Sequence, residues 1–456
     1  MYPKSFFLKL VEKDLTDFEE FLHHASDADV RSLLAELHPA DIADIVERIE
    51  EDSQARLMGL LDTQGAAEVL SLVEEHRQPD VVEAISDEKL PEILDEMDSD
   101  DVADILDDLP EEDAEEILGA LPKEESEEVR QLMTYDEETA GGLMQTELVK
   151  VTPELTMAQA AEKVRELAED ATDIQNIYVV DREGVLKGFF PMQKLILEPP
   201  DKKVGEVIEE DYFSVPADLD QEEVAEMFQK YDLLSLPVVD KNGVLLGRIM
   251  VDDIVDVIQE EASEDIYRLA GVDTEEHVSD SPFRSVRLRL PWLSINVLTA
   301  MVAASVVGLF QETIQKAVIL AVFMPIVASV GGNAGTQSLA VITRGIALGD
   351  LEFGNAKKAL LKEITAGIVN GIIVGVILAI VGFFWAGKPV LGYVLGLAMI
   401  CNMFVATFTG TAIPLILKWA KVDPALASGV IVTAFTDMAG FFSFLGLATL
   451  FMHYLA

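Results

Sequence analysis

The chain has 456 residues, of which 82 are Asp or Glu and 33 are Lys or Arg, and its formal net charge is −49. An acidic excess of this size repels phosphate, so it argues against nucleic acid as a partner and favours cations. The single cysteine, Cys401, excludes a disulfide within the chain and a cysteine-based zinc site.

The negative charge is confined to the first part of the sequence. From Arg284 onward there are six Asp and Glu residues against eleven Lys and Arg, in a largely apolar stretch. The length is typical of about three domains. No apolar segment near the N-terminus is long enough for a signal peptide, so we expect the acidic part to remain in the cytoplasm.

Residues 1–135 are predicted to form an acidic α-helical superhelix. The segment "HPADIADIVERI" (38–49) resembles "DSDDVADILDDL" (98–109), since each has an acidic start and apolar residues at helical spacing. Several such units in tandem favour an α-superhelix. Acidic residues at helix starts also interact favourably with the helix dipole, which is the structural explanation for many of them.

A different pattern follows and is present twice. "IQNIYVVDREGVLKGFF" (174–190) is typical of a strand, a glycine-containing turn and a second strand. "LSLPVVDKNGVLLGRIMVDDIVDVI" (234–258) repeats this pattern and adds a helix. Another helix is predicted before each copy, at 157–169 and at 221–231. The repeat, of ~60 residues, indicates an internal duplication of α/β type.

The two copies resemble a tandem pair of cystathionine-β-synthase (CBS) domains, at 136–200 and 201–262, because both carry an apolar strand that ends in Asp and is followed by a glycine. Such pairs commonly act as regulatory sensors, often of adenine nucleotides. The next segment, 263–283, is predicted to be an amphipathic helix that links this pair to the membrane.

Residues 284–456 are predicted to be a transmembrane domain with five helices. A membrane-spanning helix needs ~20 mostly apolar residues. Five segments meet this requirement, at 291–310, 317–342, 364–386, 390–417 and 424–455. Lys and Arg residues precede the first segment and occupy the second-to-third and fourth-to-fifth connections. By the positive-inside rule, the N-terminus is expected inside and the C-terminus outside.

An acidic residue within the fifth segment indicates a cation pathway. Asp437, in "VTAFTDMAGFF" with Thr433 close by, has no Lys or Arg in the spans placed to neutralise it. A charge near the middle of the bilayer is costly and normally faces a cavity or pore. Carboxylate, amide and carbonyl oxygens suit a largely hydrated Mg²⁺, and a symmetric dimer would bring two Asp437 side chains to a shared axis.

The second segment contains three glycines beside Asn333, in "MPIVASVGGNAGTQSLA" (324–340). We expect a break in the helix here, which offers Asn333 and the backbone oxygen of Gly332 to the pathway. Irregular backbone is tolerated at membrane depth only where it lines a cavity or is buried in protein. The glycines serve either as a hinge or as a close-packing surface. A single asparagine can also join two helices, which is the expected role of Asn296.

The order of these parts resembles the MgtE family of bacterial magnesium channels, and so do four motifs: "DEETAGGLM" (136–144), "PIVASVGGNAGTQS" (325–338), "DPA" (423–425) and "TDMAG" (436–440). The resemblance covers nearly the whole chain. It implies a homodimer in the bacterial plasma membrane, whose spans form a cation pore gated by cytosolic Mg²⁺. Asp437 matches the family's pore carboxylate, Asn333 lies in its second-span motif, and 263–283 matches the helix that plugs the pore.

The resemblance also implies a set of regulatory Mg²⁺ ligands. They are acidic residues of the helical domain, the second CBS domain, the linking helix and the membrane domain: Glu68, Asp100, Asp104, Asp220, Glu222, Asp232, Asp253, Asp256, Glu261, Glu264, Asp265 and Asp423. Some relatives have an Arg-Asp pair that helps to bind ATP, but Gln193 and Lys194 stand there in this chain. Leu233 stands where an aromatic side chain could stack on a base. These departures argue against ATP binding.

The predicted function is a Mg²⁺-selective channel for divalent cation uptake, with Asp437, Asn333, Gly332 and Thr433 at the pore. Clustered carboxylates repel each other. Cytosolic Mg²⁺ that bridges the acidic surfaces of the helical domain, CBS pair and plug helix would close the channel. The alternative is a coupled secondary transporter of broader selectivity, including Co²⁺ and Mn²⁺, although no inverted repeat is seen. An enzyme is not expected, because the spans offer one lone Asp rather than an acid/base pair. The expected partners are divalent cations, membrane lipid and a second copy of the chain.

Overall fold

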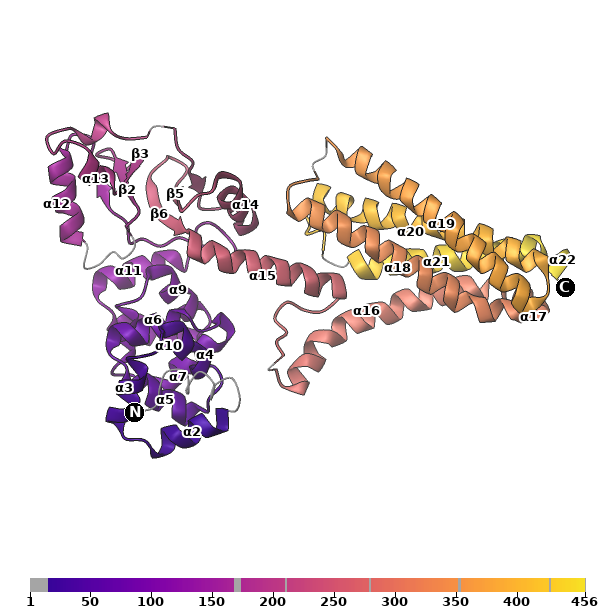
Figure 1. Ribbon diagram of the computed structural model, residues 1–456, viewed down its shortest axis with the longest axis horizontal. Coiled ribbons are helices and arrows are strands. Elements are labelled where there is room, and N and C mark those ends of the chain that lie inside the picture. The colour runs from indigo at the N-terminus through magenta and orange to yellow at the C-terminus, as the bar shows by residue number, and fades with distance from the viewer. Residues whose placement is uncertain are drawn as a thin grey trace. The chain divides into compact units, whose positions relative to one another are not determined.

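The computed structural model describes residues 15–167, 174–209, 211–278, 280–351, 354–425 and 428–455. The chain divides into two compact units, Met1–Val257 and Ile258–Ala456 (Figure 1). One helix, α15 (Val251–Ala270), begins in the first unit and ends in the second.

The first unit starts with a run of short helices: α2 (Leu15–His24), α3 (Asp27–Leu34), α4 (Pro39–Val46), α5 (Glu51–Leu60), α6 (Thr63–Ser71), η1 (Glu75–Arg77), α7 (Gln78–Ala84), α8 (Leu90–Leu94), α9 (Ser99–Asp107), α10 (Glu111–Ala120) and α11 (Lys123–Leu132). Alternate helices pack on one another, α3 on α5, α4 on α6, α5 on α7 and α6 on α8. Apolar residues of these helices, such as Leu57 of α5, Leu70 of α6 and Leu94 of α8, are buried between them. This stacking confirms the expected α-superhelix.

The rest of the first unit is of α/β type: β1 (Lys150–Val151), α12 (Met157–Leu167), β2 (Asn176–Val180), β3 (Leu186–Pro191), α13 (Lys194–Leu197), η2 (Val204–Glu206), β4 (Val215–Pro216), α14 (Gln221–Tyr231), β5 (Ser235–Val239) and β6 (Leu245–Met250). Its sheets have the orders β1-β2-β3 and β4-β5-β6. In each, the first two strands are parallel and the last two antiparallel. Both hairpin turns have a glycine in the left-handed region, Gly184 at φ 83° and Gly243 at φ 81°. The equal topology confirms the predicted duplication.

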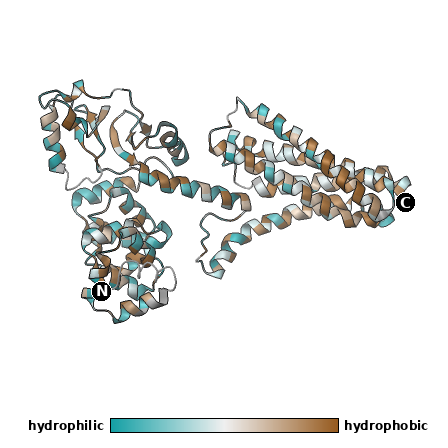
Figure 2. Cartoon of the chain, in the orientation of Figure 1, coloured by the Kyte–Doolittle hydropathy of each residue, from teal (hydrophilic) through white to brown (hydrophobic). Residues whose placement is uncertain are grey.

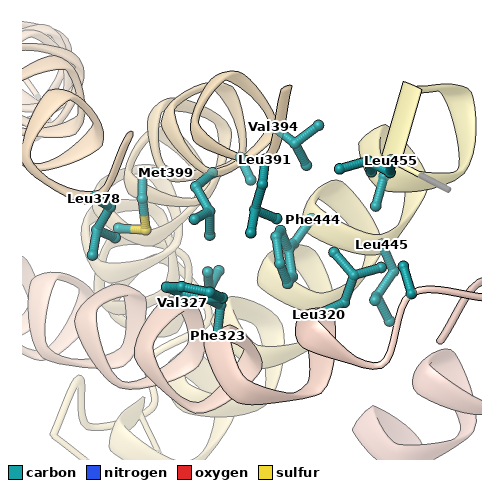
Figure 3. Packing of buried hydrophobic residues seen from close by; sticks show 14 of the residues in the cluster. Leu320, Phe323, Val327, Leu378, Leu391, Val394, Met399, Phe444, Leu445 and Leu455 are labelled. Carbon is teal, nitrogen blue, oxygen red and sulfur yellow. The ribbon is translucent and has the colours of Figure 1, made fainter. Parts of the chain in front are cut away.

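The second unit contains the end of α15 and a bundle of helices: α16 (Pro282–Gly308), α17 (Gln311–Lys316), α18 (Ile319–Ala347), α19 (Ala356–Ala386), α20 (Pro389–Trp419), α21 (Ser428–Leu450) and α22 (Met452–Leu455). Among the described residues, five helices are long and apolar enough to span a membrane, α16, α18, α19, α20 and α21. Apolar residues run along them in Figure 2. Phe323, Met399 and Phe444 belong to the apolar cluster at their centre (Figure 3). The chain is therefore a membrane protein with five apolar helices, as predicted.

The glycine-rich segment of the second span does not interrupt the helix, so the expected break there is wrong. Helix α18 is continuous from Ile319 to Ala347. A Cβ atom on Gly331 would lie 2.1 Å from Asn402 Nδ2, and one on Gly335 would lie 2.7 Å from Val432 Cγ1. Close packing of neighbouring helices offsets the ~1 kcal/mol that a glycine costs in a helix. Gly331 and Gly335 are therefore a packing surface.

The linking helix also differs from its expected range of 263–283. It is the second half of α15, which ends at Ala270. Gly271 follows at φ 71°, a left-handed conformation that commonly terminates helices. The next helix, α16, begins at Pro282 after a cap by the Ser281 side chain. The described residues between Gly271 and Ser281 form turns rather than helix.

Candidate functional site

Asp437 lies in the middle of α21 and is half-buried. In the part of the chain that the structure describes, its carboxylate has no hydrogen bond or ion pair. Thr433, one turn earlier, donates its hydroxyl to Gly429 O at 2.8 Å, and Thr436 donates to Thr433 O at 2.9 Å. Both hydroxyl hydrogens are thus used by the backbone of α21. The Asp437 carboxylate keeps its full capacity to bind a cation.

The packing of α18 against the antiparallel α21 determines which residues flank Asp437. Gly335 of α18 lies against Val432 of α21. Each further residue turns a helix by about 100°, so Gly332 and Asp437 lie beside their contact faces rather than in them. Because the two helices are antiparallel, the residue that follows a contact residue projects to the same side of the helix pair in both helices. The structure therefore brings Gly332, Thr433 and Asp437 to one side of the α18–α21 contact.

Asn333 lies on another face of α18. It is two positions from both Gly331 and Gly335, whose faces contact α20 and α21, and two positions correspond to about 200° around a helix. Its side chain is exposed. Within one chain, Asn333 is therefore turned away from Asp437.

Asn402 of α20 was not assigned to the site from the sequence, yet it is fully buried. Its Nδ2 donates to Val327 O at 2.8 Å, while its Oδ1 has no hydrogen-bond partner among the described residues. Cβ atoms on Gly331 and Gly440 would lie 2.1 and 2.9 Å from its Nδ2. Asn402 therefore fills the space between α18 and α21 and joins three helices. No sequence signal distinguished it from the other asparagines in the spans.

In the first unit, carboxylates converge around the start of α9. We call this group the α9 cluster; its members are Glu75, Asp98, Asp100, Asp101, Asp104, Glu147 and Asp253. Ser99 fixes its geometry, because its hydroxyl donates to Glu147 Oε2 at 3.0 Å and accepts the Thr146 N–H at 3.0 Å. These bonds hold the superhelix against the CBS region, within the first unit. Asp100, Asp104 and Asp253 were expected ligands, while Asp101 and Glu147 were missed.

The electrostatics of the α9 cluster are dominated by burial and by like charges. Burial and then Glu75 raise the pKa of Asp104 to about 8. Burial and then Asp252 raise the pKa of Asp253 to about 7. The pKa of Asp100 is also well above its usual range, because this side chain is buried beside Asp101. Near neutral pH, the cluster therefore resists carrying its full negative charge.

Several expected ligands lie outside the α9 cluster. Glu68 is exposed on α6. Asp220 caps α14 by accepting the Glu222 N–H at 2.9 Å, and Asp232 ends the same helix at φ 52°. Asp220 and Asp232 are separated by an 11-residue helix, ~16 Å long, so one ion cannot bind both. Asp256 is exposed one turn after Asp253, and burial raises the pKa of its carboxyl group.

A second acidic group lies in the second unit, where α15 ends. We call it the α15 seat; its members are Glu264, Asp265, Arg268, Arg344 and Asp423. Arg268 forms ion pairs with both Glu264 and Asp423. Burial raises the pKa of Asp265, Asp423 raises it further, and Arg344 opposes the shift. The structure thus brings together three expected ligands around an arginine that sequence reasoning missed; Glu261, one turn before Glu264, is half-buried on α15.

Among the described residues, no three His, Cys, Asp or Glu side chains are arranged to hold a metal ion directly.

Five apolar helices, a CBS pair, and an acidic residue in a membrane helix that has no partner among the described residues define a membrane transport protein. Family models match in the expected order, the MgtE intracellular N domain at 37–138, the CBS domain at 140–199 and 204–260, and the divalent cation transporter MgtE at 324–447. The chain belongs to the MgtE family.

Three curated relatives are named magnesium transporter MgtE. The one from Enterococcus faecalis is 38% identical over 325 residues, which cover 71% of this chain and 72% of the relative. The one from Bacillus subtilis is 35% identical over 322 residues, 71% of each chain. The one from Thermus thermophilus is 37% identical over 324 residues, 70% of this chain and 72% of the relative.

Two solved structures are similar to the soluble region. The soluble part of a magnesium transporter is 30% identical, with a TM-score of 0.50, and the match covers 55% of this chain and 99% of that chain. The cytosolic domain of the Mg²⁺ channel MgtE in complex with ATP is 35% identical, with a TM-score of 0.51, and the match covers 54% of this chain and 100% of that chain.

Proposed function

We propose that the protein is a Mg²⁺-selective channel that mediates divalent cation uptake across the bacterial plasma membrane. The observation that carries the proposal is the carboxylate of Asp437 in a membrane helix, which has no hydrogen bond or ion pair with any residue that the structure describes. A charge in that position is too costly to keep unless a cation or water reaches it. The names of the three curated relatives support Mg²⁺ as the ion.

The pathway is proposed to lie at the axis of a homodimer. Asn333 and Thr433 are exposed in a single chain. A polar face on a membrane helix is unfavourable against lipid, so it is better accommodated against a second subunit or a water-filled path. Two copies of Asp437, Thr433 and Gly332 would then line one pore, with Asn333 contributed from a different face of α18.

The orientation is proposed from charge. Arg284, Arg287 and Arg289 lie at the start of α16, and Lys357, Lys358 and Lys362 at the start of α19. By the positive-inside rule these helix ends face the cytoplasm, which puts the acidic region inside and the C-terminus outside.

Gating is proposed to depend on Mg²⁺ at the α9 cluster. Without cations, Asp100 repels Asp253 of α15, and Mg²⁺ would remove that repulsion. Asp253 and the α15 seat lie on one continuous helix, α15, which runs from Val251 to Ala270. A shift from 1% to 99% closed needs ~5.5 kcal/mol of differential binding, which five sites of ~1 kcal/mol each would supply.

ATP is not expected to be a strong ligand, although a similar cytosolic domain was solved with ATP. Lys194, which stands in place of an acidic residue of some relatives, donates to Glu209 Oε1 at 2.9 Å and to Val207 O at 3.2 Å. These bonds engage its ammonium group within the CBS region. Equilibrium dialysis of the full chain against ATP tests this expectation.

The experiment that tests the proposed function is current recording across planar bilayers that contain the purified full chain. With Mg²⁺ as the permeant ion, we expect discrete unitary currents that decrease when Mg²⁺ is added on the side of the soluble domains. Mg²⁺ uptake by liposomes without unitary currents would instead favour coupled transport, and comparison with Co²⁺ and Mn²⁺ would give the selectivity. Absence of any Mg²⁺ movement would contradict the proposal.

A further inference from the structure

The last turn of α15 carries a positive charge inside an otherwise acidic site. Arg268 forms ion pairs with Glu264, one turn earlier on α15, and with Asp423, in the connection between α20 and α21. All three side chains are partly buried, with exposed fractions of 28% for Arg268, 17% for Glu264 and 31% for Asp423. The guanidinium group can donate to two carboxylates at once because its N–H groups diverge in a plane.

Asp423 is held in place from a second direction. Its Oδ1 accepts the Ala425 N–H at 2.7 Å, while its other oxygen receives Arg268. The carboxylate is therefore oriented by the backbone of the connection and cannot swing freely toward another cation. The ion pair with Arg268 joins two fixed structures, the end of α15 and the start of the fifth span.

The backbones also approach each other closely at this point. A Cβ atom on Gly429, in the first turn of α21, would lie 2.7 Å from Leu269 O of α15. One on Gly271 would lie 3.8 Å from Val430 Cγ2. Glycine at 429 therefore permits a direct contact between the end of α15 and the helix that carries Asp437.

The charges at this contact would not favour it without Arg268. Glu264, Asp265 and Asp423 would then face one another with only Arg344 in opposition. Like charges at this range repel, most strongly where burial reduces screening by salt. Such a group would hold together only if a cation from solution joined it.

We propose that Arg268 is a built-in cation of the α15 seat, which replaces a divalent ion there and keeps α15 against α21 when Mg²⁺ is absent. If the protein is a channel, as proposed, this contact is part of its gating. Only the expected effect of Arg268 on flux rests on that proposed function. Mg²⁺ sensing is then left to the α9 cluster. The α15 seat keeps α15 attached to α21, so that α15 can pass the effect of Mg²⁺ binding at the α9 cluster on to the membrane domain.

The first test measures hydrogen exchange of the full chain in detergent, in EDTA and in millimolar Mg²⁺. In the wild type, residues 264–271 and 428–432 should be protected equally in both conditions. In Arg268→Gln, exchange there should be about fivefold faster in EDTA, the effect of a partly exposed ion pair of ~1 kcal/mol, and Mg²⁺ should restore protection. Arg268→Lys should behave like the wild type.

The matched control is Lys421→Asn, which removes one positive charge from the same exposed connection. It should leave exchange at the α15 seat unchanged. The double variant Arg268→Glu with Asp423→Arg restores an ion pair of reversed polarity and should restore protection in EDTA. Unchanged exchange in Arg268→Gln, an equal effect of Lys421→Asn, or a loss that neither Mg²⁺ nor the reversed pair restores would overturn the proposal.

The second test measures Mg²⁺ flux of the same variants in liposomes. Arg268→Gln should raise flux about fivefold when Mg²⁺ is absent from the side of the soluble domains, with full closure still reached at high Mg²⁺. Equal flux of the variant and the wild type would overturn the role in gating. If the wild type carries no Mg²⁺, the channel function fails, while the exchange experiment still decides whether Arg268 acts as the built-in cation.

Discussion

The α9 cluster and the α15 seat are both acidic, but their charges are balanced in different ways. At the α9 cluster, burial and neighbouring carboxylates raise the pKa of Asp100 and Asp104. At the α15 seat, Arg268 pairs with two carboxylates. Carboxylates that already hold an internal cation gain little from one in solution, whereas unbalanced ones gain much. An acidic sequence therefore does not by itself mark a cation sensor.

The largest expected effect is on inhibition by Mg²⁺. Replacing both Asp253 and Asp256 by Asn removes one carboxylate of the α9 cluster and a second carboxylate one turn further along α15, so Mg²⁺ at the cluster loses negative charge that attracts it. The Mg²⁺ concentration for half-maximal closure should rise about tenfold, the effect of ~1.4 kcal/mol of lost binding, while transport persists. Flux into liposomes at varied Mg²⁺ measures it.

Asp220→Asn is the control for this double variant, because Asp220 caps α14 and lies outside the α9 cluster. It should leave the Mg²⁺ dependence of flux unchanged. If the Mg²⁺ concentration for half-maximal closure is unaltered in the Asp253 and Asp256 double variant, the claim that the α9 cluster rather than the α15 seat senses Mg²⁺ is contradicted.

A smaller effect is expected from pH. Since the pKa of Asp104 is about 8 and that of Asp253 about 7, protons compete with Mg²⁺ between pH 6 and 8. Closure by Mg²⁺ should therefore require several-fold more Mg²⁺ at pH 6 than at pH 8. The α15 seat, where Arg268 pairs with Glu264 and Asp423, should contribute less. A closing concentration that is independent of pH would contradict the assignment of the sensor to the α9 cluster.

Without Mg²⁺, the free energy of unfolding around the α9 cluster should decrease as pH rises, whereas Mg²⁺ binding by the cluster should become stronger. The folded pKa of Asp104, about 8, lies above the value of ~3.9 for an unfolded chain, so the folded state binds the extra proton. This contribution is present at low pH and is lost as pH rises through about 8. Hydrogen exchange of residues 98–107 in EDTA should therefore be slower at pH 6 than at pH 8, after correction for the intrinsic rates.

The smallest expected effect is that of Asp104→Asn in EDTA. Above a pH of about 8, where Asp104 is charged, a neutral side chain removes the repulsion from Glu75 and should slow exchange of residues 98–107 about fivefold, the effect of ~1 kcal/mol. The three Trp residues all lie in the second unit, so their fluorescence is an internal control that should not change. Faster exchange in this variant would show that Asp104 stabilises the α9 cluster in its charged form.

Much of the fold was predictable from the sequence because its patterns are local. The strand, turn and strand repeats appear as β2–β3 and β5–β6, and the helix predicted at 221–231 is α14. Apolar runs of sufficient length gave the five membrane helices. These features depend on neighbours in the sequence, where periodicity and turn residues carry the signal.

The errors arose where the neighbours in space are far apart in the sequence. Gly331 is compatible with a broken helix or with close packing, and only Asn402, 71 positions later, decides for packing. Arg268 lies four positions after Glu264, which is the spacing of an ordinary surface ion pair on a helix. Its second partner, Asp423, is far away in the sequence and gives no local signal. Asp101 and Glu147 come together through the bond between Ser99 and Glu147.

The most direct test of the central proposal is Mg²⁺ flux through Asp437→Ala in liposomes, with dimer assembly checked by light scattering. Glu312→Gln, which alters an exposed acid of the same unit, is the matched control. We expect flux to fall at least a hundredfold in Asp437→Ala, because the pathway loses its only carboxylate on α21, while the control transports normally. Normal Mg²⁺ flux in Asp437→Ala would remove this carboxylate from the pathway and contradict the proposed function of the site.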